Sequence, residues 1–424
     1  MDGARPETGG AGNGAALLLQ RIPTLGLWAF GVLFAAAFFS PYWLVMNLVH
    51  TLWWEGPGWT SSEGVNMGRD FIAFYSAADL TLNGNPAGVY DHETIHAVQQ
   101  STIGAPTKFF PWFYPPTMLM FVAPLALMHY LVAFAVWVLL PLIALAAFMR
   151  RYIGSIWAGA AVVLFPATAH SLLAGQNGII SALIVAGGLL NLERKPVLAG
   201  AILGLLSYKP HIAATVYAAL LFGGYWRALG SAACVALMLA LASLIAFGPD
   251  PWWAFVRESA TARKLMESGG LRWSFMVAPF ATARLAGLDV YAAYALQAVV
   301  SCGALFVLFT VWRRGDLPLE QRVAVLVTVV PLMTPYVFSY DLVMMGLALL
   351  WLGRVAWETG FRRGEAVVFA LVWVIAPAGW LIAHHSSNVL VTPLVIIALL
   401  AVVLRRIPRP GEHGGLVESG LKAA

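Results

Sequence analysis

Asp70 is the acidic residue that the sequence marks most clearly for chemistry. It is the third residue of the segment 68–91, GRDFIAFYSAADLTLNGNPAGVYD, which holds three acids in a chain with only 11% charged residues. Residues 71–82 are predicted to form a helix that stops at Asn83 and Gly84. Asp70 would then cap that helix, because free N–H groups favour an acid there. It could equally act as a general base in a cleft, and a cap can also serve as a base.

Lys209 is the second charge in an unusual place, since it lies in an apolar run and precedes a proline. A charge within the membrane indicates function, with an anionic partner. Snorkelling to the interface is the structural alternative. His211 lies two residues on, which favours an anionic headgroup as the partner. Asp341, in the late motif FSYD, could pair with Lys209, cap its helix or contact a substrate.

Four further polar residues are candidate substrate contacts, and three of them also have a structural interpretation. Tyr114 stands before two prolines, which fix an extended elbow that either ends a loop or presents the ring to a substrate. Gln176 and Asn177 lie between glycines in GQNG, where amides cap helices or bind hydroxyls. Tyr340 precedes Asp341 and is grouped with it as a substrate contact. Asp79 and Asp91 are interpreted as structural.

The segment 257–270, RESATARKLMESGG, is predicted to be a surface helix at the membrane interface. Its basic residues Arg257, Arg263 and Lys264 would suit a phosphate, although a solvated face is the commoner outcome. No metal motif, nucleotide loop or catalytic serine pattern is present, so we expect no metal and no cofactor. Cys234 and Cys302 lie in apolar runs, where we expect two buried thiols and no disulfide.

The composition places these residues in a membrane protein. Hydrophobic residues make up 60% of the 424-residue chain, and the mean hydropathy is +0.78, far above a soluble domain. A span needs roughly 20 apolar residues, fewer inside a bundle. About twelve runs qualify by this measure: 24–49, 130–149, 155–173, 178–192, 197–209, 212–225, 228–247, 290–312, 322–335, 338–353, 366–384 and 388–404.

Arginine and lysine fall in alternate connectors, which the positive-inside rule places in the cytoplasm together with both termini. The other face then receives the long loop at about 50–116 and the segments 175–178, 207–211, 248–289, 334–341 and 384–388. Polar chemistry is therefore predicted on the outer face. Residues 115–128 are interpreted as an interfacial or re-entrant helix. Residues 1–20 and 408–424 are predicted cytoplasmic tails around one transmembrane domain, 21–407.

Five blocks in order resemble glycosyltransferase family 87. They are RDFIAFYSAADLTLNGNPAGVYD, FYPPTMLMFVAPLALM, AGQNGIISALIVAGGLL, LAGAILGLLSYKPH and TPYVFSYDLVMM, which together cover roughly residues 65–350. The resemblance implies an all-α, polytopic GT-C fold. It also implies an inverting hexosyltransferase that moves a sugar, mannose in the characterised members, from a polyprenyl-phosphate donor to a lipid or glycan acceptor outside the cell.

The same resemblance assigns roles to residues. An acid in the first outer loop is the general base in such enzymes, and here it is Asp70. Lys209 and His211 are then the residues expected to neutralise the departing phosphate. Family members often carry a histidine in the late outer motif, whereas this chain has Tyr340 and Asp341 there. The expected partners are the donor, the acceptor and the lipid bilayer of a bacterial-type inner membrane, with no nucleic acid.

A secondary transporter or flippase for a lipid-linked substrate is the main alternative, since it would also have about twelve spans and broken helices. Such proteins usually carry an internal repeat, and no duplicated block is found in this sequence, where the long outer loop occurs once. A related enzyme with another donor, or a scaffold without activity, would be further alternatives. A scaffold would leave Asp70 and Lys209 without an explanation.

Overall fold

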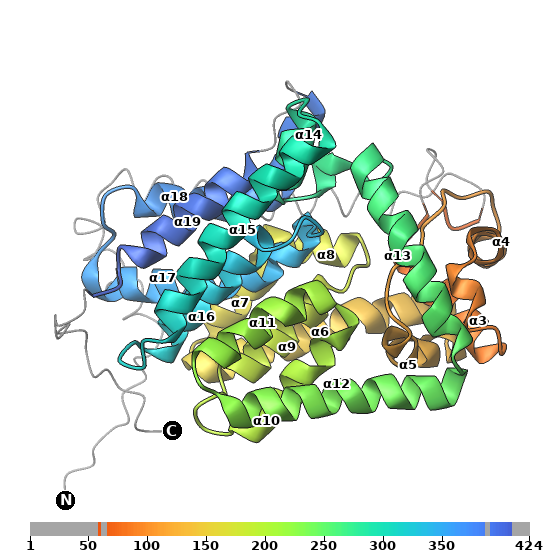
Figure 1. Ribbon diagram of the computed structural model, residues 1–424, viewed down its shortest axis with the longest axis horizontal. Coiled ribbons are helices and arrows are strands. Elements are labelled where there is room, and N and C mark those ends of the chain that lie inside the picture. Colours follow the sequence, from red (N-terminus) through yellow and green to blue (C-terminus); the bar gives the residue numbers. More distant parts are fainter. Residues whose placement is uncertain (1–57, 61–65, 386–390, 409–424) are drawn as a thin grey trace, which may run out of the picture.

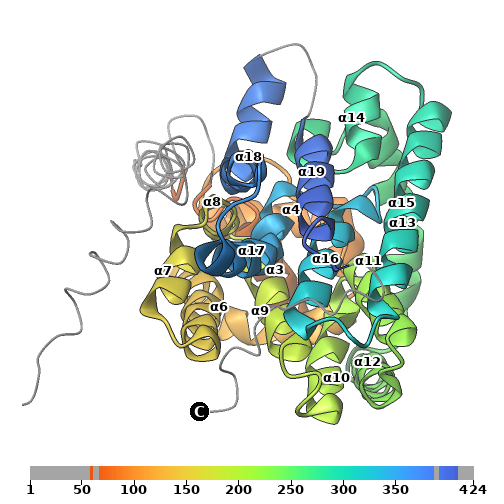
Figure 2. The same cartoon turned by 90° about the vertical axis from the view of Figure 1, so that its left-hand side faces the viewer.

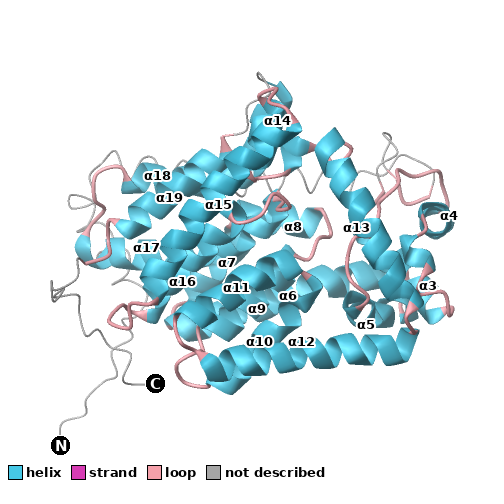
Figure 3. Cartoon of the chain, in the orientation of Figure 1, coloured by secondary structure: helices cyan, strands magenta, loops and turns pink. Residues whose placement is uncertain are grey.

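The structure is a computed structural model that describes residues 58–60, 66–385 and 391–408. All regular elements in these residues are helices (Figure 3). The β-structure among them is limited to two isolated bridges, Thr60 with Asn66 and Met276 with Phe338. The predicted all-α class is confirmed for this part of the chain. The predicted tail 1–20, span 24–49, loop start 50–57 and most of the tail 408–424 lie outside the described residues.

Short helices form the part of the long loop that is described. They are α3 (Phe71–Leu82), η1 (Gly88–Tyr90), α4 (His92–Ile103), α5 (Thr117–Val122) and η2 (Ala123–Leu127). The limits predicted for α3 are confirmed: Asn83 is its C-cap and Gly84 follows with φ +77°, a value that favours glycine. Asp91 is structural as predicted, because its carboxylate caps α4 by accepting from Thr94 N over 2.8 Å.

The bundle proper begins at Tyr130. Its first half comprises α6 (Tyr130–Ile153), α7 (Ile156–Leu164), α8 (Pro166–Leu173), α9 (Gly178–Leu189), α10 (Pro196–Gly204), η3 (Leu205–Tyr208), α11 (Pro210–Phe222) and α12 (Trp226–Phe247). The second half comprises α13 (Asp250–Ser268), η4 (Trp273–Phe275), α14 (Pro279–Leu285), α15 (Val290–Trp312), α16 (Leu319–Val329), η5 (Val330–Leu332), η6 (Ser339–Met345), α17 (Gly346–Thr359), α18 (Glu365–His385) and α19 (Thr392–Leu404).

Four helical stretches of the described residues are long and apolar enough to cross a membrane: Tyr130–Ile153, Trp226–Phe247, Val290–Trp312 and Ser339–Thr359. The bent pair α7 and α8, broken by 54°, would be a fifth. Five of the remaining predicted spans, 178–192, 197–209, 212–225, 366–384 and 388–404, overlap apolar helices of 10–17 residues. The predicted span 322–335 is not among these helices, and 24–49 lies outside the described residues. Broken and short helices are tolerated at membrane depth only where protein or a cavity surrounds them. A polytopic helical protein is therefore supported, while the count of twelve spans stays a prediction, as does the interfacial place of α5 and η2.

Within the described residues, the basic connectors gather at one end of the bundle, which is the left side of Figure 1. Side-chain contacts join connectors that are far apart in the sequence. Arg322 pairs with Glu193 over 2.7 Å, and Tyr152 donates to Glu320 over 2.8 Å. Arg314 donates to the carbonyl of Pro408 over 2.7 Å. Helices α3, α4 and α13 lie at the opposite side of that view. The basic connectors and these three helices are therefore at opposite ends of the molecule.

Close helix packing in the bundle depends on small residues. A Cβ on Gly200 of α10 would lie 2.1 Å from the carbonyl oxygen of Ala228, so α10 and α12 approach there backbone to backbone, as Figure 2 also shows.

The expected burial of Cys234 and Cys302 was wrong, because both are exposed. They lie on the long apolar helices α12 and α15, whose outer faces lipid would cover. Both thiols are free, so the expectation of no disulfide is confirmed for this pair.

Candidate active site

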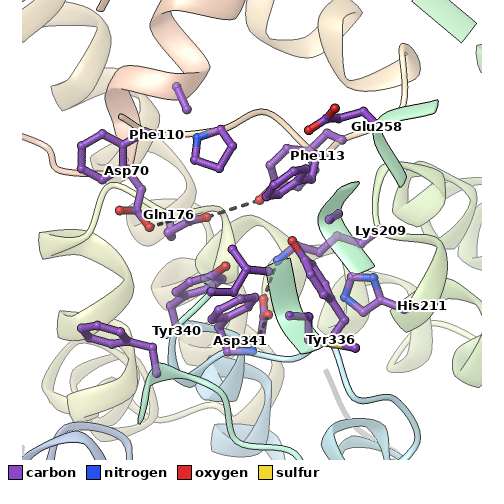
Figure 4. Close-up of a pocket in the computed structure, with 18 of the residues that line it drawn as sticks. Asp70, Phe110, Phe113, Gln176, Lys209, His211, Glu258, Tyr336, Tyr340 and Asp341 are labelled. Carbon is purple, nitrogen blue, oxygen red and sulfur yellow. Dashed lines mark hydrogen bonds and ion pairs between the residues drawn. The ribbon is translucent and has the colours of Figure 1, made fainter. Parts of the chain in front are cut away.

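A cavity of about 980 Å³ lies away from the basic connectors and collects most of the predicted site residues. Its walls come from α3, the loop 108–115, α13, the junction of α10 with α11, and the segment 335–341. Figure 4 shows the labelled residues facing one another across this space. Seven predicted residues line it: Asp70, Tyr114, Gln176, Lys209, His211, Tyr340 and Asp341. Asn177 is fully buried and is not among the lining residues, so it offers no surface to a substrate in this conformation.

Asp70 occupies the N-cap position of α3, yet its side chain makes no capping hydrogen bond. Its carboxylate instead accepts a hydrogen bond from Gln176 Nε2 over 2.7 Å (Figure 4). Removal of water around the half-buried carboxyl raises its pKa, and the bonds from Gln176 and the nearby charge of Arg69 act in the opposite direction. The Asp70 carboxylate therefore does not cap α3, although the residue stands at the N-cap position.

The backbone beside Asp70 is strained. Arg69 has φ +44°, the one positive φ on a residue other than glycine in the described part of the chain. Such a conformation costs of order 1–3 kcal/mol and persists only where the surroundings hold it. Two bonds do so: Asn66 Nδ2 donates to the carbonyl of Arg69 over 2.8 Å, and Asp70 N donates to Ala174 O over 3.1 Å. The turn that presents Asp70 is thus fixed from two sides.

The two glycines of GQNG explain why Gln176 reaches Asp70. Gly175 has φ +64°, and a Cβ there would lie 2.4 Å from the carbonyl oxygen of Gly68. A Cβ on Gly178 would lie 2.0 Å from the carbonyl oxygen of Tyr340. Only glycine permits both approaches. The motif therefore packs the loop of Asp70 on one side and the Tyr340 segment on the other, with Gln176 between them.

Tyr114 extends the network around Asp70. Its hydroxyl donates to Gln176 Oε1 over 3.4 Å, and its carbonyl accepts from the Tyr90 hydroxyl over 2.8 Å. Burial raises the pKa of the Tyr114 hydroxyl well above its ordinary value, so it remains a protonated donor. Phe74 packs on the ring, with centroids 5.3 Å apart. The prolines after Tyr114 thus position a hydrogen-bonded tyrosine at the cavity.

Lys209 and Asp341 form an ion pair at the opposite wall from Asp70 (Figure 4). Both side chains are almost fully buried, at 3% and 4% exposure. Two of the three alternatives for Asp341 are observed together: it pairs with Lys209, and its Oδ2 accepts from Phe338 N at the start of η6 over 3.4 Å. Contact with a substrate stays a prediction. The Lys209 ammonium also lies 5.5 Å from the ring centroid of Tyr340. His211 faces Tyr336, with ring centroids 5.9 Å apart. The intramembrane charge of Lys209 is therefore compensated within the protein.

One face of α13 forms the remaining wall. The cavity-lining residues of this helix follow helical spacing: Phe255, Glu258, Ser259, Ala262, Arg263 and Met266. Glu258 also contacts His92 of α4 over 2.7 Å, which ties the helix to the outer loop. The prediction of a helix over 257–270 is confirmed through Ser268. Of its three basic residues singled out by sequence, Arg263 lines the cavity and Arg257 and Lys264 do not.

Several lining residues were missed by sequence reasoning. His170 on α8 contacts the hydroxyl of Ser339 over 3.0 Å, and Tyr336 lies beside His211. An isolated histidine in the apolar run 155–173 was the available signal for His170. Within the described residues, no three His, Cys, Asp or Glu side chains are grouped as a metal site would need. The expectation that no metal takes part stays a prediction.

The helical fold and this cavity define a membrane protein with a positioned carboxylate in a cavity lined by both charged and aromatic side chains. The sequence model of glycosyltransferase family 87 matches residues 112–335, more than half of the chain. The chain belongs to glycosyltransferase family 87 and is a membrane glycosyltransferase. The matched region includes Tyr114, Gln176, Lys209 and His211, whereas Asp70 lies before it. No curated protein and no solved structure is matched by the chain.

Proposed function

We propose that the protein transfers a hexose, with mannose favoured, from a polyprenyl-phosphate sugar to a hydroxyl of a lipid or glycan acceptor. The observation that carries this proposal is the carboxylate of Asp70, which faces a substrate-sized cavity and is oriented by Gln176 rather than used as a helix cap. Family membership favours sugar transfer over transport. A carboxylate of this kind is what activation of a neutral hydroxyl requires.

The reaction is a single displacement with inversion at the anomeric carbon. The acceptor oxygen bonds to this carbon while the bond from the carbon to the phosphate oxygen breaks, and its electron pair stays on the phosphate. Asp70 receives the proton of the acceptor hydroxyl and later releases it to water. Because Gln176 binds Oδ2, the other carboxylate oxygen is the one proposed to take the proton. The proposed products are a glycosylated acceptor and a polyprenyl phosphate.

The other lining residues are proposed as substrate contacts. Tyr340 stacks on Phe338 with centroids 5.4 Å apart and planes 7° apart, which gives a flat aromatic surface for a sugar ring. Lys209, Asp341, His211 and Tyr114 supply polar groups around it.

The proposed orientation places the cavity on the outer face of a bacterial-type inner membrane. Support comes from the basic connectors, which contact one another at the end of the bundle away from the cavity. Under the positive-inside rule that end is cytoplasmic. A lipid-phosphate donor fits this orientation, since nucleotide sugars are cytoplasmic substrates.

The proposal is tested with protein reconstituted into lipid vesicles. Polyprenyl-phosphate mannose and its glucose counterpart are supplied in turn, with a bacterial lipid extract as acceptor, and labelled products are separated. The expected result is transfer by the wild-type protein and none by Asp70→Asn. Equal transfer by both proteins would remove Asp70 as the base. Glycolipid and polysaccharide profiles of a deletion strain would identify the acceptor.

A further inference from the structure

The cavity is lined by more basic than acidic side chains. Five are basic and three are acidic: Arg69, Lys108, Lys209, Arg263 and Arg272, against Asp70, Glu258 and Asp341. Lys209 and Asp341 neutralise each other within the protein, and Arg69 adjoins Asp70. Glu258 hydrogen-bonds His92, whose ring is charged only if protonated, so Glu258 counts as one acidic group against the three remaining cations. An excess of positive charge therefore remains on Lys108, Arg263 and Arg272, which we call the mouth cations.

The mouth cations are available to a ligand in a way that Lys209 is not. Lys209 could bind a phosphate only by giving up Asp341, which would leave a buried carboxylate without its partner, at a cost of several kcal/mol. The mouth cations are exposed. Arg263 has only a distant contact, 3.9 Å to Glu267, with 65% of its side chain exposed. Binding an anion here disrupts no buried ion pair.

An apolar wall adjoins these charges. Five phenylalanines line the same cavity from the segments that carry the mouth cations: Phe109, Phe110, Phe113, Phe255 and Phe275. Lys108 directly precedes two of them, and Arg263 shares its helix with Phe255. Cations at the water-exposed rim beside an aromatic wall match an amphiphile with one anionic group and a long hydrocarbon chain.

The position of this group relative to Asp70 indicates which substrate it serves. Glu258, five residues before Arg263 on α13, lies across the cavity from Asp70 in Figure 4. In an inverting displacement the base and the leaving group are on opposite sides of the sugar. A phosphate on the α13 side would therefore be the one that departs, and its added negative charge would be stabilised there.

We infer that Lys108, Arg263 and Arg272 form the binding site for the phosphate of the lipid-linked sugar donor, with its polyprenyl chain on the adjoining phenylalanines, and that Lys209 is not a phosphate ligand. This inference rests on the proposed function for its reaction step. It changes the expected role of Lys209, and it assigns three residues that the sequence patterns did not group together.

The test compares two double variants that each remove two positive charges. Arg263→Gln/Arg272→Gln alters the mouth, whereas Arg257→Gln/Lys264→Gln alters exposed residues that do not line the cavity. Binding of polyprenyl phosphate, and of uncharged polyprenol as a control lipid, is measured with each protein in phosphatidylcholine nanodiscs. Donor and acceptor kcat/KM are measured in the same preparations. Lys108→Gln is measured separately.

The mouth variant is expected to lose about tenfold in affinity for polyprenyl phosphate and a similar factor in donor kcat/KM, about twofold to fivefold for each charge. The mouth variant should keep the acceptor KM of the wild type. The control variant should keep the wild-type affinity for polyprenyl phosphate and the wild-type donor kcat/KM. Added salt should weaken binding to the wild-type protein more than to the mouth variant. Lys108→Gln should show the single-charge effect.

Three results would overturn the inference: no preference of the wild-type protein for polyprenyl phosphate over polyprenol, unchanged binding by the mouth variant, or a change confined to acceptor KM. The last would assign the cations to an acceptor phosphate. The proposed function is tested separately. A wild-type protein that binds polyprenyl phosphate through these residues but transfers no sugar would sustain the site and refute the reaction.

Discussion

Gln176 donates its side-chain N–H to the carboxylate of Asp70 over 2.7 Å, across 106 positions of sequence. The other end of the same amide accepts from Tyr114. Since an amide has one donor group and one acceptor oxygen, these two contacts fix which way it faces. Gln176 is therefore a positioning residue that presents Asp70 to the cavity, a more specific role than the substrate contact that its motif suggests.

Asp70→Asn should abolish transfer and leave the fold intact. Asparagine keeps the shape and can accept from Gln176, but it cannot take a proton, and loss of a general base lowers rates by about 10²–10⁴. Asp79→Asn is the matched control, because this acid lies on the same helix and does not line the cavity. Steady-state rates in vesicles measure both variants. Comparable loss in the two would indicate a structural effect on α3.

The same variant should raise thermal stability. Burial raises the pKa of the Asp70 carboxyl above 3.8, so the folded chain binds this proton more tightly than the unfolded chain does. The carboxyl therefore favours folding at low pH, and this contribution is lost as pH rises through the folded pKa. Asparagine removes the charge, so the Tm gain should be largest above that pKa and vanish below it. A lower Tm at neutral pH would contradict this.

The pH profile of kcat/KM should shift when Gln176 is replaced. Its hydrogen bond lowers the pKa of Asp70 against the larger effect of burial, and the base must be ionised to act. Gln176→Leu should therefore raise this pKa, move the acid limb of the profile to higher pH and lower the plateau rate by about tenfold. Tyr114→Phe removes only the contact to the far end of the amide and should shift the limb less. An unshifted limb with Gln176→Leu would remove its positioning role.

Local signals in the sequence were sufficient for α3 and its surroundings. Glycine, asparagine and the apolar run set both ends of that helix, and Asp91 caps the next one. Burial was not predictable in the same way: Cys234 and Cys302 are exposed, because an apolar residue suits a lipid-facing surface as well as a protein core. Hydropathy alone does not separate the two environments.

The site needed contacts that no local pattern encodes. The sequence marked seven predicted site residues and also Arg263 as individuals, yet it left Asp341 with three alternatives and did not pair Gln176 with Asp70. The hydrogen bond of Gln176 to Asp70 and the ion pair of Lys209 with Asp341 each join segments more than 100 residues apart. The glycines of GQNG were the usable clue, since they allow the two approaching segments to touch. Their partners follow only from the tertiary fold.

A double-mutant cycle on Lys209 and Asp341, completed by the single variants Lys209→Met and Asp341→Leu, separates a structural ion pair from a phosphate ligand. Lys209→Met leaves the Asp341 carboxylate buried without a partner and should destabilise the protein by about 3–5 kcal/mol. Lys209→Met/Asp341→Leu removes both charges and keeps most of the volume, so most of that stability should return. Thermal unfolding in detergent measures this coupling.

Donor binding by the double variant shows whether Lys209 also binds the donor phosphate. If the pair only stabilises the cavity wall, the double variant should keep affinity for polyprenyl phosphate within about threefold of the wild type. Loss of a buried lysine that binds the phosphate directly would lower the affinity by about tenfold or more. If Lys209 binds the donor phosphate, stability should recover while donor affinity stays low. That second result would identify Lys209 as the ligand of the donor phosphate and would contradict this role for Arg263 and Arg272.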